Sequence, residues 1–127
     1  MIQKNRVELF GRVGYIECKF LENDKASVKT DVLLGIKKEN ATGDSENDWE
    51  NFFVTFWNTK KTATAENIAE KIKKGDYIRI VGKLVENRYI PKGLEQIKEN
   101  EKTEINIVGY GFKKMIFDDF ENTWVEA

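Results

Sequence analysis

The sequence contains no histidine among its 127 residues. The imidazole of histidine is the most frequent general base in proteins, and it also activates serine and cysteine nucleophiles and binds metal ions. The only serines, Ser27 and Ser45, lie in stretches typical of loops. We therefore expect no catalytic residues and predict that the protein is not an enzyme.

Cysteine, glycine-rich phosphate loops and long apolar runs are also scarce or missing. The single cysteine, Cys18, can form neither an internal disulfide nor a two-sulfur metal site, which fits a reducing compartment. No apolar run approaches the roughly 18 residues of a spanning helix, and the N-terminus lacks the apolar stretch of a secretory signal. No GxGxxG or Walker-type motif is present. We expect a cytoplasmic protein with no membrane association, no cofactor and no metal site.

Charge of either sign is abundant but nearly cancels. Charged residues make up 34% of the chain, the net charge is −1 and the pI is about 5.7. Domains that bind nucleic acid mainly through electrostatics are commonly basic, so this composition argues against a purely electrostatic binder. The acidic residues concentrate in residues 39–50 and after Asp118. The region between them is therefore locally more basic.

The densest aromatic stretch, DWENFFVTFW, spans residues 48–57. In a strand, successive side chains point to opposite faces. One face would carry Phe52, Val54 and Phe56, which suit a core. The opposite face would carry Trp49, Asn51, Phe53, Thr55 and Trp57. Because that second set mixes large rings with polar groups, it suits a surface on which flat bases stack.

Four further strands and one helix are predicted from hydrophobic periodicity. Strands are expected at residues 5–14, 27–38, 76–89 and 103–112, and a helix at residues 64–74. Thr62 or Thr64 is expected to cap the helix and Gly75 to stop it. Glycines inside the strands, such as Gly11, indicate sharp bends. This order predicts an all-β fold, a five-stranded OB-fold barrel with one short helix between strands 3 and 4; an open meander packed on one helix is the alternative.

Alternation within the predicted strands also assigns single side chains to the inside or the outside. In the second strand we expect Leu34 inside and Asp31 outside, and in the fourth strand Leu84 inside and Tyr89 outside. The connection at residues 39–48 is rich in turn formers and acidic residues, which is typical of a mobile hairpin loop.

Taken in order, these segments resemble the bacterial single-stranded DNA-binding proteins. The opening NRVELFGRV is similar to the family's Asn-x-Val-x-Leu-x-Gly-x-Leu strand, and SVKTDVLLGIKKE resembles its second strand. AENIAEKIKKGDYIRIVGKLVENRY resembles its helix, Lys-Gly stop and fourth strand, and KTEINIVG its last strand. The resemblance implies an OB-fold single-stranded DNA-binding domain over residues 1–113, followed by a short C-terminal extension over residues 114–127.

The resemblance implies sequence-independent binding of single-stranded DNA, protecting exposed strands in replication, recombination or repair. Trp49 and Tyr89 match aromatic positions that stack on bases, and Trp57 is a further candidate. Phe53 shares the outward face of the aromatic strand. The cations that would line the phosphate path are Arg6, Arg12, Lys37, Lys38, Arg79, Lys83 and Arg88.

The resemblance leaves the oligomeric state open. It implies a homotetramer, or a dimer if the chain is closer to tailless primosomal relatives. The sequence ends at WVEA without the family's usual Gly/Pro/Gln-rich tail and acidic tip, so we expect a short form without tail-mediated recruitment of other proteins. The alternative function is an OB-fold protein-interaction module, in which the outward aromatics dock a protein partner.

Overall fold

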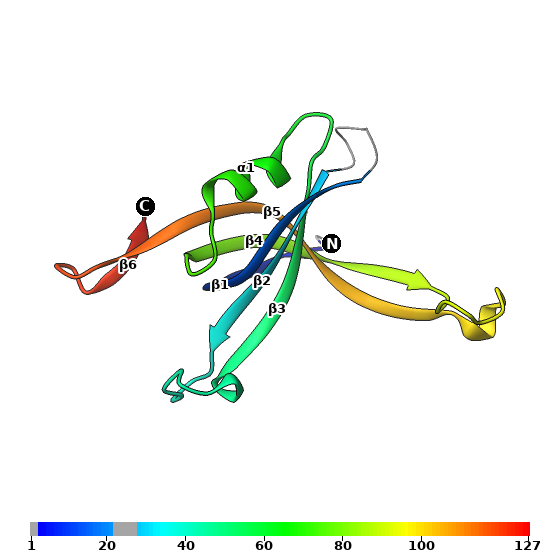
Figure 1. Ribbon diagram of the computed structural model, residues 1–127, viewed down its shortest axis with the longest axis horizontal. Coiled ribbons are helices and arrows are strands. Elements are labelled where there is room, and N and C mark those ends of the chain that lie inside the picture. Colours follow the sequence, from blue (N-terminus) through cyan, green and yellow to red (C-terminus); the bar gives the residue numbers. More distant parts are fainter. Residues whose placement is uncertain (1–2, 22–27) are drawn as a thin grey trace.

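The computed structural model describes residues 3–21 and 28–127 (Figure 1). Its strands are β1 (Val7–Phe20), β2 (Val28–Lys37), β3 (Trp49–Trp57), β4 (Tyr77–Tyr89), β5 (Lys102–Asp118) and β6 (Thr123–Glu126). An α-helix, α1 (Thr64–Lys71), lies between β3 and β4, and short 3₁₀ turns occur at Glu46–Asp48 and Lys98–Asn100. Within these described ranges, no helix has the length and apolar character needed to cross a membrane.

The first five strands close into a barrel. Antiparallel pairing joins β3 to β2, β2 to β1, β1 to β4 and β4 to β5. A parallel pairing of residues 54–56 with residues 107–109 then joins β3 to β5 and closes the circle. This closure confirms the predicted five-stranded OB-fold with its helix between the third and fourth strands. The open meander is excluded.

Two glycines allow neighbouring strands to approach one another closely. β1 changes its partner from β4 to β2 beside Gly11, where an added Cβ would lie 2.4 Å from the carbonyl oxygen of Gly35. On β5, an added Cβ at Gly109 would lie 2.3 Å from Cε2 of Phe56. Neither position has room for a side chain, and Gly11 lies where the barrel turns, as its place inside a predicted strand indicated.

The core is a cluster of apolar side chains that the barrel encloses and α1 covers. Ile68 of the helix belongs to this cluster together with Val54 and Phe56 of β3, and all three are fully buried. Phe53 and Trp57, on the opposite face of β3, remain exposed. The two faces predicted for this strand are therefore confirmed.

The start of α1 differs from the prediction. Its N-cap residue is Ala63, and the neighbouring threonines that were expected to cap it do not. Instead, the side-chain carbonyl of Asn58, buried just after β3, accepts hydrogen bonds from the backbone N–H groups of Ala65 and Glu66 (2.9 and 3.3 Å). These are N–H groups of the first turn that an N-cap side chain would otherwise satisfy.

Three elements differ in length from the prediction. α1 ends at Lys71, and Gly75, with a φ of +95°, forms part of the turn into β4. β1 continues to Phe20 through a bulge between Val13 and Tyr15. β5 continues to Asp118 and pairs with β6, so it crosses the expected boundary between residues 113 and 114 without a break.

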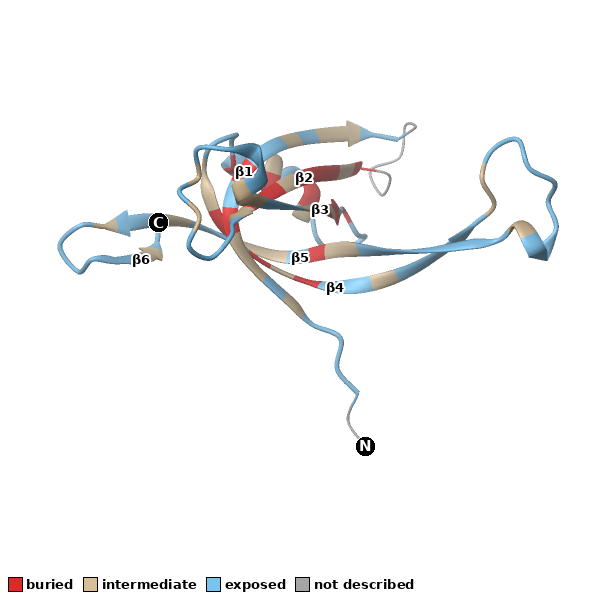
Figure 2. Cartoon of the chain, turned by 90° about the horizontal axis from the view of Figure 1, so that it is seen from below, coloured by how far each residue is buried: buried red, intermediate tan, exposed pale blue. Residues whose placement is uncertain are grey.

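Two hairpins project from opposite sides of the barrel (Figures 1 and 2). The β4–β5 arm comprises residues 84–89 and 102–107, and the C-terminal hairpin comprises residues 113–126. Leu84 lies at the base of the arm, and 44% of its surface is exposed. Its predicted inward position is wrong, because the alternation of β4 continues past the point where the enclosed core ends.

Candidate nucleic-acid interface

The outer face of β1, β2 and β3 carries its side chains in rows that run across the strands. The strand register places Tyr15, Leu33 and Phe53 side by side in the middle of this face. Tyr15 and Phe53 are 42% and 53% exposed. Because alternate residues of a strand share a face, Trp49 lies at one end of the same face and Trp57 at the other. Large rings are thus spaced along the whole length of β3.

A groove of about 410 Å³ separates β3 from the β4–β5 arm. Phe53 and Trp57 line it from β3, and Val85 and Asn87 line it from the arm. Tyr89 follows two residues after Asn87, so it lies on the same side of the arm, where its side chain is exposed. The aromatic rings that line the groove itself come from β3, and Tyr89 adds an exposed ring further along the arm, outside the lining.

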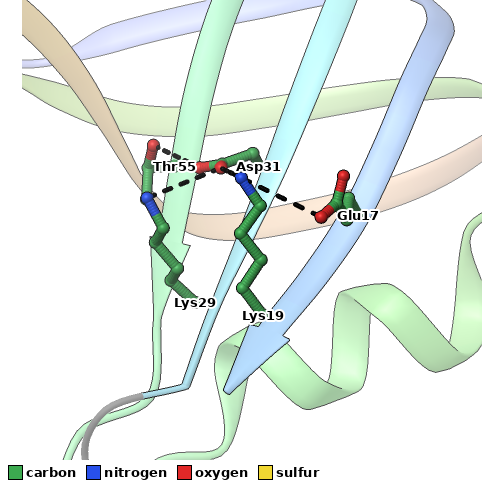
Figure 3. Close-up of polar contacts among 5 residues, drawn as sticks. All are labelled: Glu17, Lys19, Lys29, Asp31 and Thr55. Atoms are coloured by element: carbon green, nitrogen blue, oxygen red, sulfur yellow. Dashed lines mark hydrogen bonds and ion pairs between the residues drawn. The ribbon is translucent and has the colours of Figure 1, made fainter. Parts of the chain in front are cut away.

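Asp31 of β2 lies on this face but is only 2% exposed (Figure 3). Thr55 donates a hydrogen bond to its Oδ1 (2.9 Å), and the Nζ atoms of Lys19 and Lys29 each lie 3.6 Å from its Oδ2. Glu17 adds a second carboxylate, 3.9 Å from Nζ of Lys19. The predicted outer face of Asp31 is confirmed, but its side chain is buried there because residues of the flanking strands and Lys29 cover it. The four charges balance, so the cluster fixes both lysines without adding net charge.

Trp49 is held from several sides at the other end of the face. Its Nε1–H donates a hydrogen bond to the carbonyl oxygen of Gly43 (3.1 Å). The guanidinium carbon of Arg12 lies 4.4 Å from the ring centroid, within the range of a cation–π interaction. Lys37 is the cross-strand partner of Trp49. This end of β3 therefore combines an aromatic ring with two positive charges.

Four of the predicted cations have no carboxylate partner among the residues that the structure describes. The ion pairs found within the described ranges do not include Arg12, Lys37, Lys38 or Lys83. The first three lie near the Trp49 end of the face, and Lys83 lies on β4, on the side of that strand that continues into the groove wall. Their charges are free to attract phosphates.

The remaining predicted cations lie away from the groove. Arg6 and Arg79 both form ion pairs with Glu8 and line a separate depression over β1, β4 and β5. Arg88 precedes Tyr89 and so faces the opposite side of the arm, where it pairs with Glu86. The hydrogen bond that Nε–H of Arg88 donates to the carboxylate of Glu86 raises the pKa of Arg88 above its usual value. The structure does not bring these three arginines together with the aromatic face.

A comparison with known families shows to which family the chain belongs. A model described as the single-strand binding protein family matches residues 4–112. The chain belongs to this family. The matched residues include strands β1 to β4, the whole β4–β5 arm, and β5 as far as residue 112. Family membership supports single-stranded DNA binding in general and confirms the resemblance found in the sequence. A comparison with curated proteins gave no match.

Three residues of the candidate interface escaped the sequence analysis. Tyr15 and Lys19 were missed because the first predicted strand ended at Gly14, where the structure has a bulge rather than a strand end. Lys29, whose Nζ lies 5.8 Å from the ring centroid of Trp57, was detectable. It precedes Asp31 by two residues, so the alternation of β2 placed it on the outer face.

The loop between β2 and β3 of this family member is organised by Asp48. The Oδ2 atom of Asp48 accepts hydrogen bonds from the backbone N–H groups of Gly43 (3.1 Å) and Ser45 (3.2 Å) and from the hydroxyl of Thr42 (3.2 Å). The N–H of Ser45, followed by that of Gly43, lowers the pKa of Asp48 below its ordinary value of 3.8. The loop that holds the indole of Trp49 therefore depends on an ionised carboxylate.

We expect the contact between this loop and Trp49 to be lost in acid. Because the pKa of Asp48 is lowered on folding, its contribution to stability is complete above the unfolded value near 3.8 and disappears as the pH falls through the lower folded pKa. An NMR titration of the Asp48 carboxyl carbon should have its midpoint below 3.8, and the indole N–H signal of Trp49 should shift with the same midpoint. In Asp48→Asn, that signal should lie at its acid position already at neutral pH. A midpoint at or above the ordinary value contradicts the expectation.

Proposed function

We propose that this chain binds single-stranded DNA irrespective of base sequence, with bases stacking on Phe53, Trp57 and Tyr89. The observation that carries the proposal is the groove between β3 and the β4–β5 arm, which Phe53 and Trp57 line from β3, with Tyr89 exposed further along the same side of the arm. Unpaired bases stack on aromatic side chains with about 1–3 kcal/mol each, largely independent of base identity. A groove of this kind suits a strand whose bases are not paired.

Phosphate contacts in this proposal come from a small set of cations. Lys19 and Lys29 are compensated by Asp31 and Glu17, so they contribute less than their number indicates. Direct phosphate contacts would come from the four cations that form no ion pair within residues 3–21 and 28–127, namely Arg12, Lys37, Lys38 and Lys83. Stacking would then supply more of the affinity than charge does, which agrees with a net charge of −1.

The proposed role is the protection of exposed strands in replication, recombination or repair. Family members act as assemblies of barrels, and we propose a homotetramer or a homodimer for this chain. Light scattering coupled to size-exclusion chromatography distinguishes the two, since the mass should be a fourfold or a twofold multiple of the 14.8 kDa chain.

A titration with oligo(dT) tests the proposal. Because Trp57 borders the groove, tryptophan fluorescence should be strongly quenched on binding. Each phosphate contact contributes about −0.7 to the slope of log K against log salt concentration for single strands, so four contacts set a limit of about −2.8.

The matched control is duplex DNA of the same length, which should bind weakly because its bases are not available for stacking. Absence of both binding and quenching with oligo(dT) at low salt would contradict the proposal. That result would favour the OB-fold protein-interaction module instead. A slope much steeper than the limit would show that more cations than these four contact phosphates.

A further inference from the structure

The C-terminal hairpin lies outside the region that matches the family, which ends at residue 112. It folds back so that Trp124 of β6 joins a cluster of aromatic rings. The ring centroids of Tyr77, Phe10 and Phe117 lie 4.6, 5.4 and 5.4 Å from that of Trp124. These neighbours fix the orientation of Trp124, yet 36% of its surface stays exposed. An oriented ring with an open surface is a suitable platform for another flat ring.

The exposed part of Trp124 contributes to a cleft of about 470 Å³ at the Trp49 end of β3. Tyr77 and Trp49 line the same cleft, together with the cations Arg12 and Lys37. None of the described residues that line it is acidic. Its volume falls within the range of about 300–1,000 Å³ that is usual for small-molecule sites, so a single nucleotide can be accommodated.

We propose that this cleft is an additional nucleotide subsite, formed jointly by the barrel and the C-terminal hairpin. A base would stack on the exposed part of Trp124, beside Tyr77, and its phosphate would contact Arg12 and Lys37. The subsite rests on the proposed function, because the nucleotide belongs to the same single strand that occupies the β3 groove. It extends the bound strand past Trp49 onto residues that the family match does not include.

Charge and continuity favour a nucleic-acid strand over a protein partner in this cleft. Arg12 and Lys37 have no carboxylate partner among the described residues, so an anion would compensate them. The cleft is also continuous with the outer face of β3, because Trp49 belongs to both. A strand running along that face reaches the cleft without leaving the protein surface.

Tryptophan-specific observation of the intact protein tests the subsite directly. The chain has three tryptophans, so labelling with 5-fluorotryptophan gives three ¹⁹F resonances, which single Trp→Phe variants assign. Addition of (dT)16 should shift the resonances of Trp57 and Trp124 together. Trp124→Ala should weaken (dT)16 binding by about 5- to 150-fold, the range that corresponds to one stacked base.

Phe120→Ala is the matched control, since Phe120 lies on the same hairpin, is 95% exposed and does not line the cleft. It should leave the affinity for (dT)16 unchanged. If (dT)16 shifts the resonance of Trp57 but not that of Trp124, the subsite is wrong and the proposed function stands. The same holds if Trp124→Ala binds (dT)16 with the affinity of the unmodified protein. If (dT)16 does not bind at all, both fail. Equal losses in both hairpin variants would mean that the hairpin acts through stability or assembly and not through a base stacked on Trp124, and would overturn the subsite.

Arg12→Gln and Lys37→Gln give a second measurement that does not disturb the aromatic cluster. Each should make the salt slope shallower by about 0.7, the contribution of one phosphate contact on a single strand. An unchanged slope in both variants would also overturn the subsite.

Discussion

Replacing Gly109 with alanine should lower the free energy of unfolding by about 3 kcal/mol, near the upper end of the usual cost of overpacking. The added Cβ would lie 2.3 Å from Cε2 and 2.4 Å from Cζ of Phe56. The Phe56 ring is fully buried, and it meets Phe112 edge-on with a centroid distance of 6.2 Å, so it cannot move aside without displacing other core atoms. The clash falls at the pairing of β3 with β5 that closes the barrel. Urea denaturation should show a lower midpoint with an unchanged slope.

Gly111→Ala is the control for this effect. It changes the same residue type two positions further along β5, where the nearest atom to an added Cβ, Cβ of Val81, is 4.0 Å away. Its effect should stay within about 0.5 kcal/mol. Phe56→Leu should cost stability alone but reduce the cost of Gly109→Ala in the double variant, because the two residues are in contact. If the stability losses of Phe56→Leu and Gly109→Ala simply added in the double variant, the Phe56 ring would not be the group with which the new methyl clashes.

The barrel was predictable because the hydrophobic periodicity of each segment agrees with the strand and helix positions that a closed barrel requires. Alternation identified the core residues of β3, and the helical spacing of Ile68 and its neighbours identified α1. The errors lie where a distant contact overrides a local rule. Asn58 caps the helix from the end of β3, although two threonines stand at the expected positions. Leu84 follows the inward pattern of β4 but lies beyond the core, and no local signal marks where a strand leaves the barrel.

The interface was predictable only in part, because parity gives the face of a residue but not its neighbours. The face of Trp57 and Phe53 followed from alternation. Trp49 shares this parity, yet the guanidinium of Arg12 covers one side of its ring, a contact between strands that the sequence does not encode locally. Asp31 lies on the predicted outer face, but alternation alone does not reveal that Lys19 of β1 and Lys29 of β2 cover it there. For Arg88, alternation was sufficient: it places Arg88 on the side of the arm opposite to Tyr89.

The pairing of charges decides which substitutions affect DNA binding. Arg79 looks like a phosphate contact in the sequence, but it is paired with Glu8 in a depression away from the groove. Lys29 is absent from the sequence-based set, but it lies beside Trp57. Under the proposed function, the aromatic pair on β3 therefore dominates the affinity, and Arg79→Gln should change neither the affinity nor the salt slope.

Removal of both groove aromatics of β3, in the double variant Phe53→Ala and Trp57→Ala, should weaken oligo(dT) binding by about 2–6 kcal/mol, the sum of two stacked bases. Fluorescence anisotropy of a labelled oligonucleotide is the suitable measurement, because the variant loses a tryptophan. The two side chains are 53% and 38% exposed and lie outside the core cluster. The free energy of unfolding should therefore change much less than the binding energy does.

Tyr110→Ala provides the matched control for this double variant. Tyr110 is 54% exposed on β5, but it lines a hollow beside α1 rather than the groove. Removing it takes away one exposed aromatic ring from another part of the barrel. If stacking in the groove carries the affinity, Tyr110→Ala should bind oligo(dT) as the unmodified protein does. If instead the double variant keeps its affinity, the strand does not follow β3, and the groove is not the site of binding. Equal weakening of oligo(dT) binding in the double variant and in Tyr110→Ala would indicate that these rings act through stability or assembly. In the proposed arrangement, the bound DNA contacts the groove but not the hollow beside α1.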